Sequence, residues 1–165
     1  MTRPVPGLSI EDQSAEVLAV MLIYGEARNQ SDVAMCGPLC VALNRAYKHQ
    51  PYSLGFQSEP ERLKQVILYP WAFSCFNEKD PNRAKMLTAW QDAPRAWGAC
   101  TAVADLVLVG ACGDPTQDAS HYCTKTLWNT PGSGWFQADE IASGRTIKTA
   151  ELGDHVYARA PGKFL

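Results

Sequence analysis

A glutamate that ends an apolar segment is the most chemically suggestive feature of the sequence. Residues 17–24, VLAVMLIY, run directly into the motif GEAR at residues 25–28. If the segment is a helix, Glu26 lies at its C-terminal end, where the helix dipole disfavours a second negative charge. The apolar side chains of Leu22 and Ile23 share its helix face, and the loss of hydration that they cause also disfavours the charged form of the carboxyl group. The pattern predicts a carboxyl group that keeps its proton more readily than a free glutamate, as a general acid requires.

The two neighbours of Glu26 in this motif are expected to support it in different ways. Gly25 places no side chain beside the carboxyl group, which would leave space for a bulky substrate. Arg28 does not share the helix face of Glu26, so we expect it to fix the following segment rather than to neutralise the acid. The competing interpretation is that Glu26 merely ends a helix in solvent, because perturbed carboxylates also occur in structural networks.

Length and composition limit the classes of function. A chain of 165 residues is long enough for one domain with its own core, and 46% hydrophobic and 19% charged residues are typical of a soluble globular protein. The net charge of -2 supplies no basic surface for DNA or RNA, and no apolar run reaches the length of a membrane span. We expect a single domain over residues 1–165 with a leader at 1–9, no nucleic-acid partner and no stable membrane insertion.

The N-terminal residues and the cysteines bear on the compartment in which the protein acts. Residues 1–12 hold one arginine but no apolar core and no cleavage-type ending, so they do not predict a Sec signal peptide. The protein would then be made in the cytoplasm and need another component to deliver it outside. The six cysteines match no disulfide scaffold and no paired metal motif, although Cys36 and Cys40 lie one helical turn apart. We expect mostly buried free thiols, with one or two disulfides if the protein is exported.

Helices are expected over the first two thirds of the chain. Apolar periodicity and capping residues predict them at residues 10–28, 32–48, 59–68, 81–90 and 94–109. Ser9 followed by two acidic residues is typical of a capped start for the first helix. Gly37-Pro38 should kink the second helix or delay its start, and Ser58 should open a capping box for the third.

The last third of the chain has a different texture. From Gly113 onward, Gly, Pro, Asp, Thr and Ser alternate with aromatic residues, which indicates loops and short strands. Residues 145–152 and 155–160 alternate between apolar and polar positions and are joined at Gly153-Asp154, which predicts an antiparallel hairpin. The expected fold is therefore α+β: a helix-rich single domain with a small antiparallel sheet.

Five motifs occur in an order that resembles the SleB-like cell wall hydrolases, the spore cortex-lytic type. They are YGEAR at residues 24–28, ALNRA at 42–46, VILYPWAFS at 66–74, DPTQDASHY at 114–122 and GDHVY at 153–157. The resemblance implies a fold similar to lysozymes and lytic transglycosylases, with peptidoglycan glycan strands as substrate and Glu26 as catalytic acid/base. The sequence departs from the family pattern at three places. Asp118 replaces a glycine, Ala72 replaces a frequent glutamine, and Tyr157-Ala158 replaces an ending like Phe-Tyr.

The resemblance also implies a reaction that needs only one carboxylate. In a lytic transglycosylase, the C6 hydroxyl of N-acetylmuramic acid attacks the anomeric carbon of its own sugar and gives a 1,6-anhydro product, without a metal ion or cofactor. A hydrolytic muramidase needs a second carboxylate, for which Asp114 and Asp118 are the candidates. The residues expected to bind substrate are Arg28, Asn44, Phe73, Ser74, Asp114, Thr116, His121, Tyr122, Trp135 and His155.

Other interpretations of these residues stay open at this stage. Trp71, Phe73, Trp128 and Trp135 offer stacking surfaces for sugar rings, but aromatic residues more often fill a core. His121 and His155, with Cys123 or Asp114, would be the ligands of a zinc-dependent amidase or peptidase, and Cys123 with His155 those of a thiol enzyme.

The biological setting allows two further readings. The missing signal peptide and the missing wall-binding module suit a monomeric bacteriophage endolysin that acts in the periplasm or cell wall, although a bacterial wall-remodelling enzyme without its leader would look the same. A non-catalytic glycan-binding or virion structural domain that keeps the fold is the main alternative to an enzyme.

Overall fold

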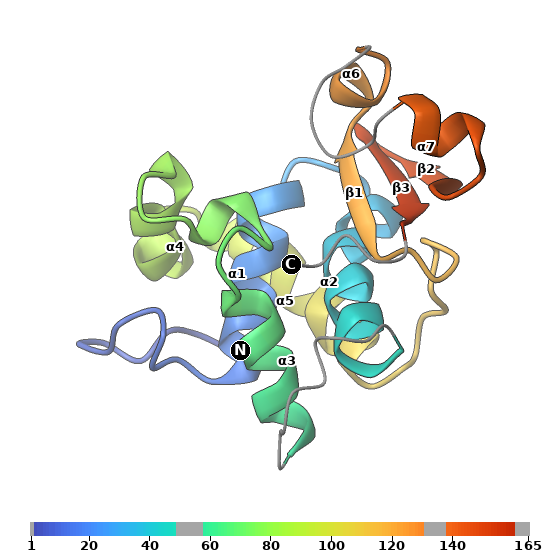
Figure 1. The fold of residues 1–165 in the computed structure, drawn as a ribbon. Helices are drawn as coiled ribbons and strands as arrows, with labels where there is room; N and C mark the ends of the chain where they lie inside the picture. The colour runs from blue at the N-terminus through green and yellow to red at the C-terminus, as the bar shows by residue number, and fades with distance from the viewer. Residues whose placement is uncertain (1, 49–57, 131–137, 161–165) are drawn as a thin grey trace.

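A bundle of helices carries a small antiparallel sheet at one end (Figure 1). The computed structural model describes residues 2–48, 58–130 and 138–160. Its longer helices are α1 (Ala15–Ala27), α2 (Asp32–Tyr47), α3 (Glu59–Leu68), α4 (Pro81–Asp92) and α5 (Pro94–Leu108). The shorter elements are the 3-10 helix η1 (Ser74–Phe76), α6 (Lys125–Trp128), α7 (Ala138–Ala142) and the strands β1 (His121–Thr124), β2 (Ile147–Leu152) and β3 (His155–Arg159). The predicted α+β class is confirmed.

Helix α1 is the central element of the bundle. It packs against α2, α3, α4 and α5, and Val17 to Tyr24 are all buried. A helix that is apolar around its whole circumference belongs inside a core, which is why the segment before Glu26 shows no polar face. The helix therefore forms a rigid base for the carboxylate at its end.

The start of α1 differs from the prediction. The helix begins at Ala15 instead of residue 10, and Ser14 caps it by accepting a hydrogen bond from the Val17 N–H. The buried Gln13 amide accepts a hydrogen bond from the Val5 N–H and donates to the Val5 and Leu8 carbonyls. These bonds fold the preceding residues back onto the body, so the helix cannot extend to Ser9, and the predicted cap there is wrong.

The other long helices lie within two residues of their predicted ranges, with two differences in detail. Helix α2 begins at Asp32 without delay and continues through Pro38. Gly37 lies against the ring of Tyr157, and a Cβ added there would overlap the phenolic oxygen. Helix α3 spans the predicted residues, but among the described residues the side chain of Ser58 makes no capping bond, so the predicted capping box is wrong.

The sheet has the strand order β1-β3-β2, with both pairs antiparallel. The predicted hairpin is confirmed as β2 and β3, and its turn contains Gly153 with a φ of 55°. Tyr122 lies opposite Tyr157 in the register, and these rings belong to the core that the helices form. Cys123 and Ala158 lie on the other face, in a smaller apolar cluster with Leu127, Trp128 and Ile141.

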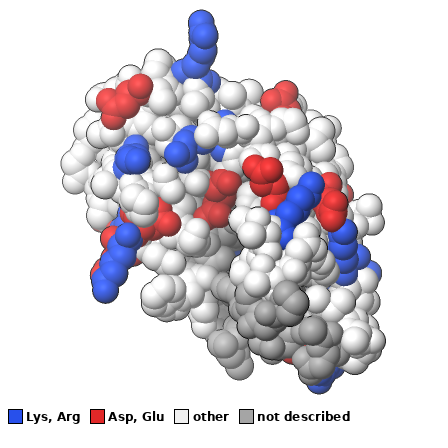
Figure 2. Space-filling view, turned by 90° about the horizontal axis from the view of Figure 1, so that it is seen from above, with Lys and Arg blue, Asp and Glu red and all other residues white. Residues whose placement is uncertain are grey.

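The surface agrees with the composition. On the face shown in Figure 2, basic and acidic side chains are mixed rather than gathered into one basic area. Within the part of the chain that the structure describes, none of the helices combines the length and apolar character needed to cross a bilayer.

Candidate active site

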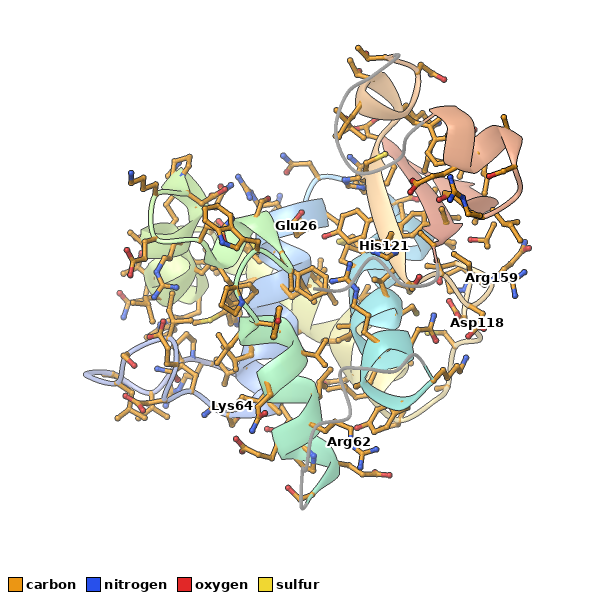
Figure 3. The ribbon with its side chains drawn as sticks, in the orientation of Figure 1. Glu26, Arg62, Lys64, Asp118, His121 and Arg159 are labelled. Atoms are coloured by element: carbon orange, nitrogen blue, oxygen red, sulfur yellow. The ribbon has the colours of Figure 1, made fainter. Side chains whose placement is uncertain are left out.

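The carboxylate of Glu26 is held in one orientation at the end of α1. Glu26 is the second-last residue of the helix and is partly exposed (Figure 3). Its Oε1 accepts one hydrogen bond from the Ser74 hydroxyl and one from the Cys75 N–H, each 3.0 Å long. Among the described residues both bonds end on Oε1, which leaves Oε2 as the oxygen that can face a substrate. The predicted position of Glu26 at a helix end is confirmed.

The space beside Glu26 is filled differently from the prediction. A Cβ added at Gly25 would lie 2.5 Å from the Cβ of Cys75 and 3.2 Å from the sulfur of Met86. Gly25 therefore lets η1 and α4 pack directly on α1, and the interpretation that it leaves room for substrate is wrong. This close approach brings Ser74 and Cys75 within reach of the carboxylate.

Arg28 fixes the end of α1 to the neighbouring helix. Its guanidinium donates to the Tyr24 carbonyl at 2.9 Å and to the Asn82 side chain at 3.3 Å, and lies 4.9 Å from the centre of the Tyr24 ring. These contacts go to Tyr24 and Asn82 rather than to the segment that follows Arg28, so the expectation that it fixes the following segment stays a prediction. Its role in substrate binding stays a prediction.

Three ring side chains from the sheet gather beside Glu26. His155 meets the Tyr122 ring edge to face at 5.1 Å, and Tyr157 lies 5.5 Å from Tyr122. Burial and the nearby charge of Glu26 raise the pKa of Tyr122 well above its usual range, so its phenol stays neutral. Burial lowers the pKa of His155, against the opposing effect of Glu26 and Asp154, which favours a neutral imidazole at neutral pH.

Arg45 connects the segments on either side of this cluster, and sequence reasoning did not include it among the site residues. The side chain is buried; its Nε donates to the Ser120 carbonyl at 2.6 Å and a terminal nitrogen donates to the Ala72 carbonyl at 3.1 Å. The guanidinium also lies 4.9 Å from the centre of the buried Phe73 ring. One signal in the sequence could have identified Arg45: it is a basic residue next to Asn44, near the end of a mostly apolar helix.

The loop before β1 is organised around Asp114. Its Oδ1 accepts bonds from the N–H and hydroxyl of Thr116, and its Oδ2 accepts from Asn44 and the Asp118 N–H. Burial alone would raise the pKa of Asp114, but the donors Thr116, Asn44 and Asp118 outweigh it and lower the pKa. Asn44 also donates to the Ala119 carbonyl at 3.0 Å. Asn44 and Thr116 are both buried, a placement that suits shaping the loop, and direct substrate contact by them stays a prediction.

Asp118 occupies a position with the backbone geometry of a glycine. Its φ is 68°, in the left-handed region that non-glycine residues seldom adopt, and Asp is among the residues that tolerate it best. Its side chain forms a salt bridge of 3.0 Å with Lys48, and Figure 3 shows it well apart from Glu26. Neither Asp114, whose oxygens are occupied, nor Asp118 is placed to serve as a second carboxylate.

The geometry of the sheet does not support a zinc site at His121 and His155 or a thiol enzyme that uses Cys123 and His155. His155 shares a sheet face with Tyr122, whereas His121 and Cys123 point to the opposite face. His121 is buried, with its Nδ1 3.0 Å from the Ser120 hydroxyl. Among the described residues, no three His, Cys, Asp or Glu side chains could together hold a metal ion. Burial raises the pKa of Cys123 to about 11, so its thiol is not an activated nucleophile.

Ser74, whose hydroxyl donates to Glu26, is one of the residues that line an open groove of about 780 Å³. Trp71 borders it, 74% exposed, with a φ of 66°. Phe73 is buried in the core, and Trp128 packs in the smaller apolar cluster on the other face of the sheet. Trp135 lies outside the described residues. Of the predicted stacking residues that the structure describes, only Trp71 lines this groove.

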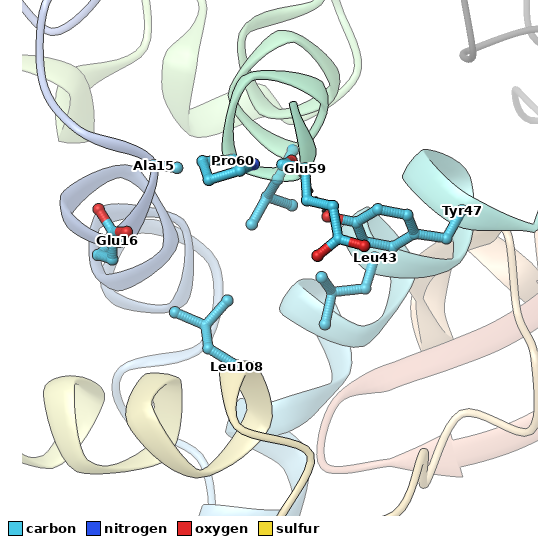
Figure 4. Close-up of a pocket in the computed structure, with 8 residues that line it drawn as sticks. Ala15, Glu16, Leu43, Tyr47, Glu59, Pro60 and Leu108 are labelled. Carbon is cyan, nitrogen blue, oxygen red and sulfur yellow. Dashed lines mark hydrogen bonds between the residues drawn. The ribbon is translucent and has the colours of Figure 1, made fainter. Parts of the chain in front are cut away.

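A second pocket, of about 330 Å³, lies at the opposite end of α1 (Figure 4). It is bordered by Ala15, Leu43 and Tyr47, and the Tyr47 hydroxyl donates to the Glu59 carbonyl at 3.1 Å. Because Ala15 and Glu26 are eleven residues apart on one helix, this pocket is separate from the carboxylate.

Comparisons with known proteins agree with the fold. The catalytic domain of the germination-specific lytic transglycosylase SleB from Bacillus anthracis is 18% identical, with a TM-score of 0.53 over 94% of this chain and 100% of that one. The catalytic domain of the Bacillus cereus SleB protein is 19% identical, with a TM-score of 0.52 over 96% and 98%. No curated protein matches the sequence.

The family comparison covers most of the chain. The model of the cell wall hydrolase family matches residues 30–158. Glu26 lies just ahead of the matched residues, so its assignment depends on the geometry described above. The chain belongs to the cell wall hydrolase family, which confirms the predicted family and its action on the cell wall.

Proposed function

We propose that this protein cleaves the glycan strand of peptidoglycan between N-acetylmuramic acid and N-acetylglucosamine, with Glu26 as the only acid/base. The observation that carries the proposal is the partly exposed carboxylate, fixed through Oε1 by the Cys75 N–H and by Ser74, which itself lines an open groove. The similarity in fold to a protein described as a lytic transglycosylase supports the same reaction.

The mechanism uses Glu26 twice. In its protonated form the carboxyl group donates its proton to the glycosidic oxygen as the bond to the anomeric carbon breaks. The resulting carboxylate then takes the proton of the C6 hydroxyl of the muramic acid, whose oxygen bonds to the anomeric carbon and closes the 1,6-anhydro ring. Each product is formed without water, and the carboxyl group returns to its starting state.

The groups around Glu26 have assigned parts in this scheme. Ser74 and the Cys75 N–H keep the carboxylate in one orientation, which limits the motion needed for both proton transfers. Tyr122 and His155, both neutral near pH 7, present polar ring groups beside the acid without adding charge. Trp71 offers an exposed indole face on which a sugar ring can stack.

Hydrolysis is the second candidate, and the groove itself favours one residue for it. Glu78 is exposed and lines the same groove as Ser74, whereas Glu11 in that groove is paired with Arg83 and Asp80 caps α4. If water replaces the C6 hydroxyl as nucleophile, we assign its activation to Glu78, the groove carboxylate that neither pairs with Arg83 nor caps α4 among the described residues. The endolysin role, the monomeric state and delivery to the periplasm remain predictions from the sequence.

Mass spectrometry of purified peptidoglycan, digested by the wild type and by Glu26→Gln, tests the proposal. Anhydromuramic ends that are absent from the variant digest are the expected result. Reducing ends would overturn the transglycosylase and direct the same experiment to Glu78→Gln. Binding of the glycan without any cleavage by the folded wild type would instead support a non-catalytic binding domain. Peptides released in a chelator-sensitive way would indicate a metal-dependent amidase.

A further inference from the structure

Two cysteines that are far apart in the sequence meet at the surface of the bundle, away from the groove. The sulfur of Cys36 on α2 lies 3.9 Å from the sulfur of Cys112, which follows the turn that ends α5. Cys36 is 9% exposed and Cys112 is half-buried at the edge of a small pocket that also includes Asp114. An external reagent can therefore reach Cys112, unlike the fully buried Cys75 and Cys100.

We propose that Cys36 and Cys112 are a site of disulfide formation, which closes when the protein meets a disulfide oxidant outside the cytoplasm. The inference depends on the proposed function only for the compartment, because disulfides persist where peptidoglycan lies. The two sulfur atoms lie 3.9 Å apart and need to approach to about 2.05 Å to form the bond.

The chemistry balances with a low-molecular-weight disulfide as oxidant. The thiolate of Cys112 attacks one sulfur of the reagent, forms a mixed disulfide and releases one thiolate. The thiolate of Cys36 then attacks the Cys112 sulfur, closes the protein disulfide and releases a second thiolate; the two protons lost by the cysteines pass through solvent to the released thiolates. The reagent is reduced by two electrons, and the two cysteines are oxidised. Burial and the neighbouring Cys112 raise the pKa of Cys36 to about 11, so the second step becomes faster as the pH rises.

The bond would tie the Asp114 loop to α2. Cys112 is two residues before Asp114, and the same loop is already bonded to Asn44 on α2. The cross-link would close a segment of 76 residues, and long closed loops restrict the unfolded chain strongly. A third thiol, Cys40, lies in the same pocket one turn along α2, yet the described residues contain no three groups arranged to hold a metal ion.

The experiment oxidises the purified full chain with glutathione disulfide and assigns the bond by mass spectrometry. Trypsin leaves Cys36 and Cys40 in one peptide, and Cys112 with Cys100 and Cys123 in another, so fragmentation of the linked pair must place the bond. The expected result is a link between Cys36 and Cys112, with a melting temperature higher by roughly 5 to 10 °C than that of the reduced protein. Cys112→Ser should abolish the link and the shift, whereas the matched variant Cys123→Ser should keep both.

Two outcomes would overturn the site. One is a wild type that keeps all six thiols titratable after oxidation; the other is a link that Cys36→Ser retains and Cys40→Ser loses. Because the reduced wild type serves as the folded reference, a variant that misfolds does not remove the test. The readouts are thiol content and melting temperature, so they stand whether or not the enzyme cleaves peptidoglycan.

Discussion

The hydroxyl of Ser74 and the carboxylate of Glu26 form a hydrogen bond of 3.0 Å between residues that are 48 positions apart. The Cys75 N–H reaches the same oxygen at the same distance. One of the two donors is a side chain that mutation can remove, and the other is backbone. Removing the Ser74 hydroxyl therefore tests how the orientation of Glu26 affects catalysis while the carboxyl group itself stays in place.

Ser74→Ala should lower kcat roughly tenfold and leave KM nearly unchanged, because a hydrogen bond to a charged group is lost while the Cys75 N–H remains. Initial rates on soluble glycan strands measure both constants. Ser58→Ala is the matched control, since this exposed serine makes no side-chain capping bond among the described residues and should leave both constants intact. A kcat equal to that of the wild type would remove Ser74 from the mechanism.

Arg45→Lys should reduce both stability and activity. A lysine has one nitrogen and cannot reach the Ser120 and Ala72 carbonyls together, so a buried acceptor loses its partner. We expect the free energy of unfolding to fall by about 2 kcal/mol in urea titrations. Arg95→Lys, at an exposed position of α5, should change neither quantity. If Arg45→Lys is as stable as the wild type, the bridge between the two segments has no structural role.

Local sequence signals were sufficient for the five long helices and the terminal hairpin, although not for the start of α1. The apolar run before Glu26 correctly predicted a buried helix that ends at this carboxylate, and the alternation on both sides of Gly153-Asp154 correctly predicted the hairpin. Both features depend on neighbours within a few residues, where periodicity and turn chemistry decide the conformation. The position of the acid at the end of a rigid element could therefore be read from the chain alone.

Which side chains contact each other depended on packing between segments that are distant in the sequence. The spacing of residues along the chain does not encode such contacts. Gly25 looked like an opening for substrate, but the space is occupied by Cys75 and Met86 from elements folded over it. His121 and His155 looked like possible joint ligands until the strand register placed them on opposite faces. The early start predicted for α1 failed because Gln13 bonds back to Val5 and Leu8, a contact no capping rule anticipates.

Gly37→Ala should destabilise the protein strongly. The added methyl group would overlap the Tyr157 hydroxyl, which is buried and has no hydrogen-bond partner among the described residues. Overpacking of this kind costs about 1 to 3 kcal/mol. Gly113→Ala is the control, since nothing lies within 4 Å of its added Cβ. Combining Gly37→Ala with Tyr157→Phe should restore part of the loss, and a double variant no more stable than Gly37→Ala would show that the clash lies elsewhere.

The pH dependence of unfolding should reveal the role of Asp114. Its pKa is lower in the folded protein than the ordinary value of 3.8, because donors from Thr116, Asn44 and the Asp118 N–H outweigh the effect of burial. The carboxylate thus stabilises the fold above about pH 4, and this contribution disappears as the pH falls through the lower folded value.

Asp114→Asn should therefore be less stable than the wild type at pH 7, by about 2 kcal/mol if a charged hydrogen bond is lost, and this difference should shrink below pH 4. Urea titrations from pH 3 to 7 measure it, with Asp105→Asn on the exposed side of α5 as the reference substitution. A difference that stays constant across this range would mean that the charge of Asp114 does not hold the loop. Because Asn44 connects that loop to α2, Asn44→Ala should show the same loss at pH 7.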